Sequence, residues 1–288
     1  MPTSAATPLP DLTGRTAIVT GGGSGIGAAT ARALAARGAR VVLAVRNREK
    51  GERAARTMPG QVEVRDLDLA DLASIRSFAA GWDGPIDLLV NNAGVSVPDL
   101  RRTADGFELQ FGTNHLGPFA LTNLLLRHVS GRVVALSSQA ERMGRIDLDD
   151  LGLERTKYVE SRVYAASKLA NLLFVTELQR RLTAAGSPVL AAAAHPGLVT
   201  TSMTTGSGGA VTRLLVRLLA QDPDQGALPV LLAATGDVPP AAFTGPERFA
   251  HMRGGAMLIG RSRQSKDPVL ASRLWSASEE LTGIGFGL

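Results

Sequence analysis

Short apolar runs alternate along the chain with segments whose apolar residues recur at helical spacing. The runs are typical of strands: TAIVT (16–20), RVVLAV (40–45), VEVRDL (62–67), IDLLVN (86–91), RVVALS (132–137) and VLAAAA (189–194). Between the first two, GIGAATARALAARG has the helical pattern, and Gly38 stands where that helix should end. Runs that are apolar on both sides are typical of strands between two helical layers. The pattern therefore predicts an α/β fold, a doubly wound parallel sheet with helices on both faces.

The chain reads as one domain over residues 12–288, because it has no internal repeat and no linker between two halves. Residues 1–11 are expected to form a disordered N-terminal tail. They lack the basic start and apolar stretch of a signal peptide, and no run reaches the ~18 apolar residues that span a bilayer. We therefore expect a cytoplasmic protein without membrane association.

Composition narrows the chemistry. The chain has no cysteine, which excludes disulfides and thiolate sites, and its four histidines are scattered without zinc-site spacing, so we expect no metal. The net charge of +5 comes mainly from arginines that are spread along the chain. Because they form no basic block, we expect no nucleic-acid partner, although the charge would help to attract a phosphate-bearing ligand.

Ligands of such sheets bind beyond the carboxyl ends of the strands. After the first strand comes TGGGSGIG (20–27), in which we assign the tight turn and the close approach to a pyrophosphate to Gly21, Gly25 and Gly27. The spacing T-G-x-x-x-G-x-G differs from the commoner G-x-G-x-x-G. Its place between a strand and a helix nevertheless predicts nucleotide binding rather than a merely flexible turn.

The end of the second strand predicts which dinucleotide is bound. An NAD-binding unit usually has an acidic residue here for the ribose 2′-hydroxyl, whereas this chain has Arg46, whose guanidinium suits a 2′-phosphate. Asn47 and Arg48 are possible helpers. We therefore expect NADP(H) rather than NAD(H).

A tyrosine and a lysine lie four residues apart in VYAASKLAN (163–171), although the chain has only two tyrosines and four lysines. Positions four apart share one face of a helix. A lysine cation beside a phenol stabilises the phenolate, so Tyr164 and Lys168 could form a proton donor that works near neutral pH. The strand ends NNAG (91–94), LSSQA (136–140) and HPGLVTT (195–201) bring further polar and turn residues to the same sheet edge.

In this order, TGGGSGIG, NNAG, TNHLG, the serine pair at 137–138, YAASK and HPGLVTT resemble the short-chain dehydrogenase/reductase family. The resemblance is strong over about residues 12–197 and weak in the C-terminal quarter. Within the family the chain is most similar to the retinol-dehydrogenase-like branch, which includes WW-domain-oxidoreductase-like proteins. VRNREKGERAA, DLASIRSFA, NHLGPFALTNLLL and LWSASEELTG carry this similarity. It implies a single Rossmann-type domain and hydride transfer between NADP(H) and a carbonyl or alcohol.

The resemblance also implies a catalytic tetrad of Asn114, Ser138, Tyr164 and Lys168. Tyr164 would donate its phenolic proton to the carbonyl oxygen, and Ser138 would donate a hydrogen bond to it. Lys168 would lower the tyrosine pKa towards neutrality and hold the nicotinamide ribose. Asn114, expected in a helix, would position a water for proton relay.

The same resemblance, together with the strand-end motifs, predicts the residues that bind the cofactor. They are Gly21, Gly23, Ser24, Gly25, Ile26, Gly27, Arg46, Asn47, Asp68, Leu69, Asn92, Ala93, Gly94, Tyr164, Lys168, Pro196, Gly197, Val199 and Thr201.

The chain departs from the family pattern between Ser138 and Tyr164, which are 26 positions apart, about twice the usual distance. The retinol-dehydrogenase-like branch has a similar insertion. We expect this extra segment (143–161) to form a flap beside the substrate. It contains Tyr158, whose neighbour four positions on is Arg162; because arginine takes no part in proton transfer, we expect no catalytic role for Tyr158. The insertion precedes a helix that many relatives use for dimer packing, so a homodimer is left open.

Substrate choice should depend on residues 198–222, which the family uses as a lid. The apolar helix within them favours a lipophilic substrate, but a lid that packs on its own domain would have the same pattern. Contact with a lipid surface is disfavoured, because the helix is short and carries two cations.

Two other functions stay open. The chain could reduce a C=C bond or catalyse a non-redox step of secondary metabolism on the same scaffold. It could also be a catalytically silent NADP(H)-sensing protein, although such a protein would not need the tetrad.

Overall fold

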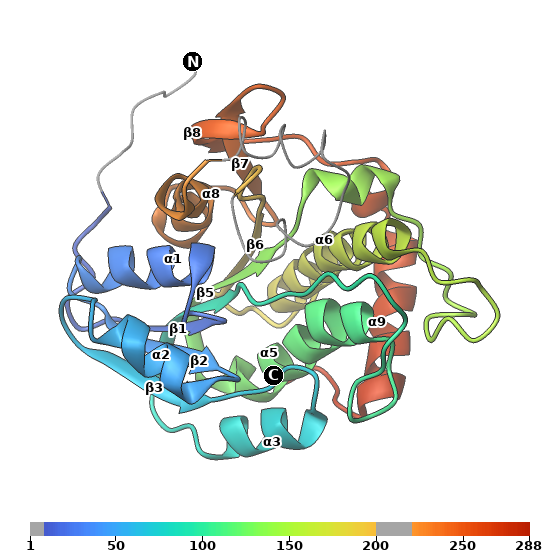
Figure 1. Cartoon of the computed structure of the whole chain (residues 1–288), viewed down its shortest axis with the longest axis horizontal. Helices are drawn as coiled ribbons and strands as arrows, with labels where there is room; N and C mark the ends of the chain where they lie inside the picture. The colour runs from blue at the N-terminus through green and yellow to red at the C-terminus, as the bar shows by residue number, and fades with distance from the viewer. Residues whose placement is uncertain (1–8, 200–220) are drawn as a thin grey trace.

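The computed structural model describes residues 9–199 and 221–288, and it contains an eight-stranded sheet in the order β3-β2-β1-β4-β5-β6-β7-β8 (Figure 1). All neighbouring pairs are parallel except β7 and β8, which are antiparallel. The strands are β1 (Thr16–Thr20), β2 (Arg40–Val45), β3 (Val62–Asp66), β4 (Ile86–Asn91), β5 (Val129–Leu136), β6 (Leu190–Ala194), β7 (Phe243–Arg248) and β8 (Arg253–Leu258). The predicted doubly wound α/β fold is confirmed.

Helices cover both faces of the sheet. They are α1 (Gly25–Ala35), α2 (Arg48–Ala55), α3 (Leu72–Ala80), α4 (Leu109–Phe111), α5 (Gly117–Leu125), α6 (Glu160–Ala184), α8 (Pro223–Thr235) and α9 (Pro268–Thr282). Shorter turns are the π-helix η1 (Gly112–Leu116) and the 3₁₀ turns η2 (Leu126–His128), η3 (Gln139–Met143) and η4 (Gln264–Lys266). Over the two described ranges, none of the helices is both long and apolar enough to cross a membrane.

The alternation of side chains along each strand builds two separate cores. In β1, Ile18 packs with the layer that contains α3, α5 and α6, whereas Ala17 and Val19 pack with α1 and α8. Figure 1 shows these two sets of helices on opposite sides of the sheet. Every central strand contributes side chains to both cores, so its sequence is a continuous apolar run. For this reason β1 to β6 could be predicted from the sequence.

The strands β7 and β8 were not predicted from the sequence. Their segments, FTGPER and RGGAML, contain proline, glycine and charged residues, which strands usually avoid. They form a hairpin at one end of the sheet, and Pro246 is tolerated because it lies beyond the residues of β7 that pair with β6, at an irregularity of the β7–β8 pairing. Three successive residues in its turn, from Phe249 to His251, have positive φ.

Gly38 ends the first helical segment as the sequence predicts, but part of the predicted disordered tail is folded. Gly38 has φ +89, and a Cβ there would lie 2.6 Å from Thr13 Oγ1, so only glycine fits. The sequence predicts a disordered tail through residue 11, whereas Leu9 packs against the core and the Pro10 carbonyl accepts a hydrogen bond from Arg37. These contacts place residues 9–11 in the folded domain, and the rest of the predicted tail lies outside the described residues.

The last helix, α9, is held by a buried aromatic cluster. Trp275 packs edge-on against Phe119, at 4.8 Å between centroids, and stacks on Phe174 at 5.8 Å. His115 lies against the same rings, and its Nε2 is 3.0 Å from Ser278 Oγ. Because the Ser278 hydroxyl donates to the Leu274 carbonyl, this Nε2 carries the proton and donates to Ser278. The other ring nitrogen of His115 makes no hydrogen bond with the residues that the structure describes.

This buried histidine predicts acid sensitivity. Burial lowers the pKa of His115 to about 3, so in the folded state the ring stays neutral where an unfolded histidine, with a pKa near 6.5, takes up a proton. Protonation therefore favours the unfolded state, and stability is lost as the pH falls below about 6.5. Between pH 7 and pH 5 this one group should cost about 2 kcal/mol of unfolding free energy.

We expect the variant His115→Gln to lose about 2 kcal/mol less stability than the wild type between pH 7 and pH 5. Urea unfolding at both pH values measures this difference, and the contributions of other titrating groups cancel in it. His128→Gln, which removes a partly exposed histidine that is not a member of the aromatic cluster, is the control. Equal pH dependence in the wild type and His115→Gln would contradict the prediction.

Candidate active site

The site forms where β1 and β4 lie side by side, the point at which the strand order reverses. Thr20, the last residue of β1, is fully buried, and its Oγ1 accepts the N–H groups of Asn92 and Ala93, both at 3.0 Å. Its carbonyl accepts the Asn92 side chain at 2.8 Å. The turn after β1 and the turn after β4 are thus held together by a single residue.

The glycine-rich turn has the close packing that a phosphate cradle needs. Gly21 has φ +65, and a Cβ on Gly27 would lie 2.4 Å from Asn92 Nδ2 and 2.6 Å from the Gly21 carbonyl oxygen. Ser24 precedes α1 in extended conformation, but its side chain does not cap the helix. The first turn of α1 therefore keeps backbone N–H groups for an anion, which fits the pyrophosphate of a dinucleotide.

The three polar residues after β2 have different surroundings. Arg46 is exposed and makes no hydrogen bond or ion pair with the described residues. Asn47 caps α2 by accepting the N–H of Lys50 at 2.8 Å. Arg48 pairs with Glu52 and, at 2.9 Å, with Asp66. Of the three, only Arg46 has a side chain that is free for a phosphate.

The predicted residues after β3 have local partners. Asp68 accepts the N–H of Ala70 at 2.9 Å, which shapes the turn. Leu69 is buried in the core, and its carbonyl oxygen would lie 2.3 Å from a Cβ on Gly117. The close contact between Leu69 and Gly117 thus fixes where α5 begins relative to β3.

The four residues of the predicted tetrad come together around Gly94. A Cβ on Gly94 would lie 3.1 Å from Asn114 Oδ1 and 3.5 Å from Lys168 Nζ. Lys168 is only 5% exposed, and its Nζ lies 5.4 Å from the centre of the Tyr164 ring. The Ser138 side chain is near enough to the Tyr164 hydroxyl to lower the pKa of that phenol. Residues from η1, from the turn after β5 and from α6 therefore meet beside the β1–β4 joint.

Asn114 lies in the π-helix η1, where its amide is bonded on both sides. Its Oδ1 accepts the N–H of Val95 at 2.7 Å, and its Nδ2 donates to the Val95 carbonyl and to Ser167 Oγ, both at 3.0 Å. The Asn114 side chain thus pairs with the backbone after β4 as a neighbouring strand would. Its water-positioning role stays a prediction.

The tyrosine pKa differs from the sequence-based expectation. Burial raises the pKa of Tyr164 to about 12, and the nearby Ser138 side chain lowers it only in part. Burial also lowers the pKa of Lys168 to about 8. The ammonium lies over the ring, where a cation–π contact favours the charge without acting directly on the hydroxyl, so loss of water outweighs its effect on the phenol. In this state the pair is a neutral phenol beside a charged lysine at pH 7.

The turn after β6 packs against the edge hairpin. Gly197 has φ +79, and a Cβ there would lie 2.4 Å from the Met252 carbonyl oxygen. Gln221 returns to this turn and donates to the Pro196 carbonyl at 2.8 Å, next to the bridge between Val199 and Gln221. Thr201 and residues 200–220 of the predicted lid lie outside the described residues.

Three residues of the site had no role assigned from the sequence. Thr20 makes the β1–β4 joint, Ser167 bonds Asn114, and Ser137 Oγ donates to the Lys168 carbonyl at 2.7 Å. All three stand inside the motifs TGGGSGIG, YAASK and LSSQA. The signal was present, but sequence spacing does not distinguish side chains that build the site from those that face a ligand.

Tyr158 is engaged elsewhere, as expected for a residue outside the site. Its hydroxyl donates to the Val97 carbonyl at 2.5 Å and accepts from Gln110 Nε2 at 2.6 Å. That the insertion that carries it forms a flap beside the substrate stays a prediction. The insertion packs through Ile146, Leu148 and Leu151 onto the outer side of α6 and α9. Its alternating apolar residues explain this position, because they need a second apolar surface to cover.

Comparison with known proteins agrees with this architecture. The family model of short chain dehydrogenases matches residues 15–210. Retinol dehydrogenase 13 from Homo sapiens is 40% identical, over 95% of this chain and 86% of its own length. A solved structure of an uncharacterised protein from Mycobacterium paratuberculosis is 51% identical, covers 99% of both chains and superposes with a TM-score of 0.88. A blue fluorescent protein from a metagenomic library, in complex with NADPH, is 28% identical over 81% of this chain and 96% of its own, with a TM-score of 0.64.

The match extends over more than half of the chain, and the relatives align over nearly all of it. The glycine-rich turn after β1, the NNAG turn after β4 and the Tyr164–Lys168 pair lie within the matched residues. The chain belongs to the short-chain dehydrogenase family and is an oxidoreductase of that family.

Proposed function

We propose that the protein uses NADP(H) to interconvert a carbonyl and an alcohol on a lipophilic small molecule. The observation that carries this proposal is the convergence of Ser138, Tyr164 and Lys168 beside Gly94, next to the glycine-rich turn after β1. One hydroxyl donor, one phenol and one buried cation are the groups that proton transfer to a carbonyl oxygen requires.

The proposed cofactor site is made by the turn after β1, the start of α1 and Arg46. The uncapped helix start and the closely packed glycines suit a pyrophosphate, and the free guanidinium of Arg46 suits a 2′-phosphate. The NADPH carried by the metagenomic blue fluorescent protein supports the same choice. When bound, the nicotinamide would supply or accept the hydride.

In carbonyl reduction, the Tyr164 hydroxyl would donate its proton to the oxygen as charge develops there. Ser138, whose side chain is near the same hydroxyl, would donate a second hydrogen bond to that oxygen. Lys168 would stay protonated, because its pKa of about 8 lies above neutral pH, and its charge would stabilise the tyrosinate as the proton leaves. Alcohol oxidation would use the same groups in reverse.

The proposed substrate class rests on the relatives and on the sequence of the lid. Retinol, which the name of retinol dehydrogenase 13 specifies, is a lipophilic alcohol. The helix expected within residues 198–222 is apolar, which suits a substrate of this kind. C=C reduction, a non-redox reaction and a silent NADP(H)-sensing role are separated from this proposal by the reaction products and by the variants below.

The catalytic assignment predicts a large difference between the two tyrosine variants. Tyr164→Phe should lower kcat at least 100-fold on the best substrate of an aldehyde, ketone, quinone and enone panel, because it removes the proton donor. Binding of NADP⁺, measured by calorimetry, should change less than threefold. Tyr158→Phe is the matched control and should retain activity within about threefold.

Retained activity in Tyr164→Phe would contradict the catalytic assignment. Turnover that reduces an enone but leaves its carbonyl intact would contradict carbonyl–alcohol chemistry and favour a C=C reductase. Binding of NADP⁺ without turnover of any compound would favour the silent binding protein.

The cofactor assignment predicts a selective effect at Arg46. Arg46→Ala should weaken NADP⁺ binding roughly 10- to 100-fold, the effect expected for a hydrogen bond between charged groups, and leave NAD⁺ binding nearly unchanged. Calorimetric titration of both nucleotides measures this without a substrate. Arg48→Ala, which removes an arginine already paired with Glu52 and Asp66, is the control. Equal losses in the two variants, or tighter binding of NAD⁺ by the wild type, would show that Arg46 does not select the cofactor.

A further inference from the structure

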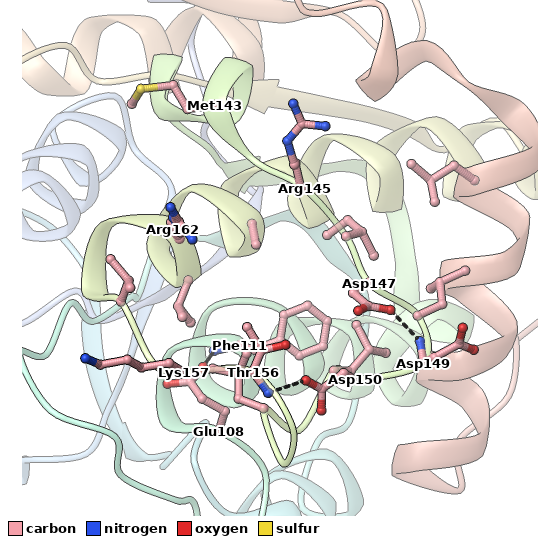
Figure 2. A pocket seen from close by; sticks show the side chains of 18 of the residues that line it. Glu108, Phe111, Met143, Arg145, Asp147, Asp149, Asp150, Thr156, Lys157 and Arg162 are labelled. Carbon is pink, nitrogen blue, oxygen red and sulfur yellow. Dashed lines mark hydrogen bonds between the residues drawn. The ribbon is translucent and has the colours of Figure 1, made fainter.

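A pocket of about 830 Å³ lies between the insertion, α6 and α9 (Figure 2). Its volume is within the range of small-molecule sites. It is lined by residues of the insertion from Met143 to Val159, by the first turns of α6, and by Leu270 and Arg273 of α9. None of the four predicted tetrad residues lines it.

The pocket is on the opposite side of α6 from the proposed catalytic pair. At 100° per residue, the centre of Val163 and Ala166 is roughly 150° around the helix from the centre of Tyr164 and Lys168. Val163 and Ala166 line the pocket, whereas Lys168 points towards the end of β5, with its Nζ 3.3 Å from the Leu136 carbonyl. The pocket is therefore separate from the proposed catalytic site.

The wall of the pocket is apolar. Phe111 and Val163 are buried, and around them lie four partly exposed side chains from the insertion and α9. These are Ile146, Leu148, Leu151 and Leu270. All four pack against one small core cluster between α6 and α9, yet they keep exposed surface where they line the pocket. An apolar ligand would remove this surface from water.

The insertion holds its shape without a ligand. The Asp150 carboxylate accepts three backbone N–H groups, those of residues 154, 155 and 156, at 2.8–3.2 Å. Leu153, inside this loop, has φ +51, a conformation that costs energy for a residue with a side chain. On the other wall, Glu108 accepts the N–H groups of Gln110 and Phe111. Both walls are therefore built before a ligand binds.

The cationic and the acidic side chains around the pocket differ in their hydrogen-bond partners. Four cationic side chains line it, all exposed, and none makes a side-chain hydrogen bond or ion pair with a described residue. They are Arg145, Lys157, Arg162 and Arg273. Of the four acids, Glu108, Asp147 and Asp150 accept backbone N–H groups, and Asp149 is exposed. Figure 2 shows Arg145, Arg162 and Lys157 along one side of the pocket and Asp147, Asp149 and Asp150 on the other.

We propose that this pocket is a second binding site, and that it binds a free amphiphilic anion with an apolar chain or ring system and one carboxylate or phosphate head group. The apolar wall of Phe111, Val163 and Leu270 would bind the body of the ligand. The unpaired guanidinium groups of Arg145 and Arg162 would bind its head, since guanidinium donors match carboxylate and phosphate oxygens. The proposal does not depend on the reaction that the catalytic site performs.

Calorimetric titration of the full chain with decanoate, kept below its micellar concentration, tests this site. Decyltrimethylammonium, a cation with a chain of the same length, should bind at least tenfold more weakly than decanoate. The double variant Arg145→Ala/Arg162→Ala should weaken decanoate binding at least tenfold. Arg56→Ala, which removes an exposed arginine directly after α2 that does not line the pocket, should change it less than twofold.

A second variant, Ala166→Trp, fills the pocket from α6 and should abolish decanoate binding. Circular dichroism and the unfolding temperature show whether each variant is folded; the double arginine variant changes only exposed side chains and provides the test even if Ala166→Trp does not fold. Equal binding of the cationic and anionic chains, or undiminished binding in the double variant, would overturn the proposal. Binding to anionic phospholipid vesicles without binding of monomeric decanoate would overturn it as well, in favour of a lipid surface.

Discussion

The joint between the ends of β1 and β4 is the contact on which the catalytic side of the molecule depends. Thr20, which is fully buried, accepts two backbone N–H groups from the turn after β4 and one side-chain donor from Asn92. Buried polar groups of this kind are costly when unpaired, so each bond fixes the position of the other turn. The closely packed Gly21 and Gly27 have their place because Asn92 is held there. The two turns that would bind a dinucleotide therefore form one rigid unit rather than two adjustable loops.

Helix α6 is positioned by the neighbouring strand rather than by its own sequence pattern alone. The Leu136 carbonyl at the end of β5 accepts Asn171 Nδ2 at 2.8 Å and Lys168 Nζ at 3.3 Å, and Ser137 bonds the Lys168 backbone. These contacts bury the lysine, which explains why its pKa falls to about 8. The same helix presents its outer face to the insertion. One rigid element thus separates two environments, a polar one beside β5 and an apolar one below the insertion.

The sequence was most informative where one physical requirement controls a residue. Apolar runs predicted β1 to β6, because strands between two helical layers need apolar residues on both faces. A lysine rather than an arginine four positions on led to the choice of Tyr164 over Tyr158. The sequence was least informative where the position or the pKa of a residue depends on residues that are distant in the chain. The hairpin strands β7 and β8 contain Pro246 and Gly254, which a regularly paired central strand would exclude; Pro246 lies beyond the residues of β7 that pair with β6, at an irregularity of the hairpin. The insertion was expected beside the substrate, but which apolar surface it covers depends on α9, which is distant in the chain. The raised pKa of Tyr164 likewise follows from burial, which spacing does not reveal.

The position of α9 in the chain has a consequence for synthesis. Trp275, Ser278 and Phe286 follow, in order of translation, all of the residues that they cover. Until these last residues leave the ribosome, the side of α5 and α6 that carries Phe119 and Phe174 has no cover, although the strands from β1 to β6 are already available to pair. The chain therefore passes through a stage in which most of the sheet can form while an aromatic surface still faces water. At that stage a chaperone that recognises exposed aromatic side chains would find its target on α5 and α6, and the docking of α9 would end the encounter.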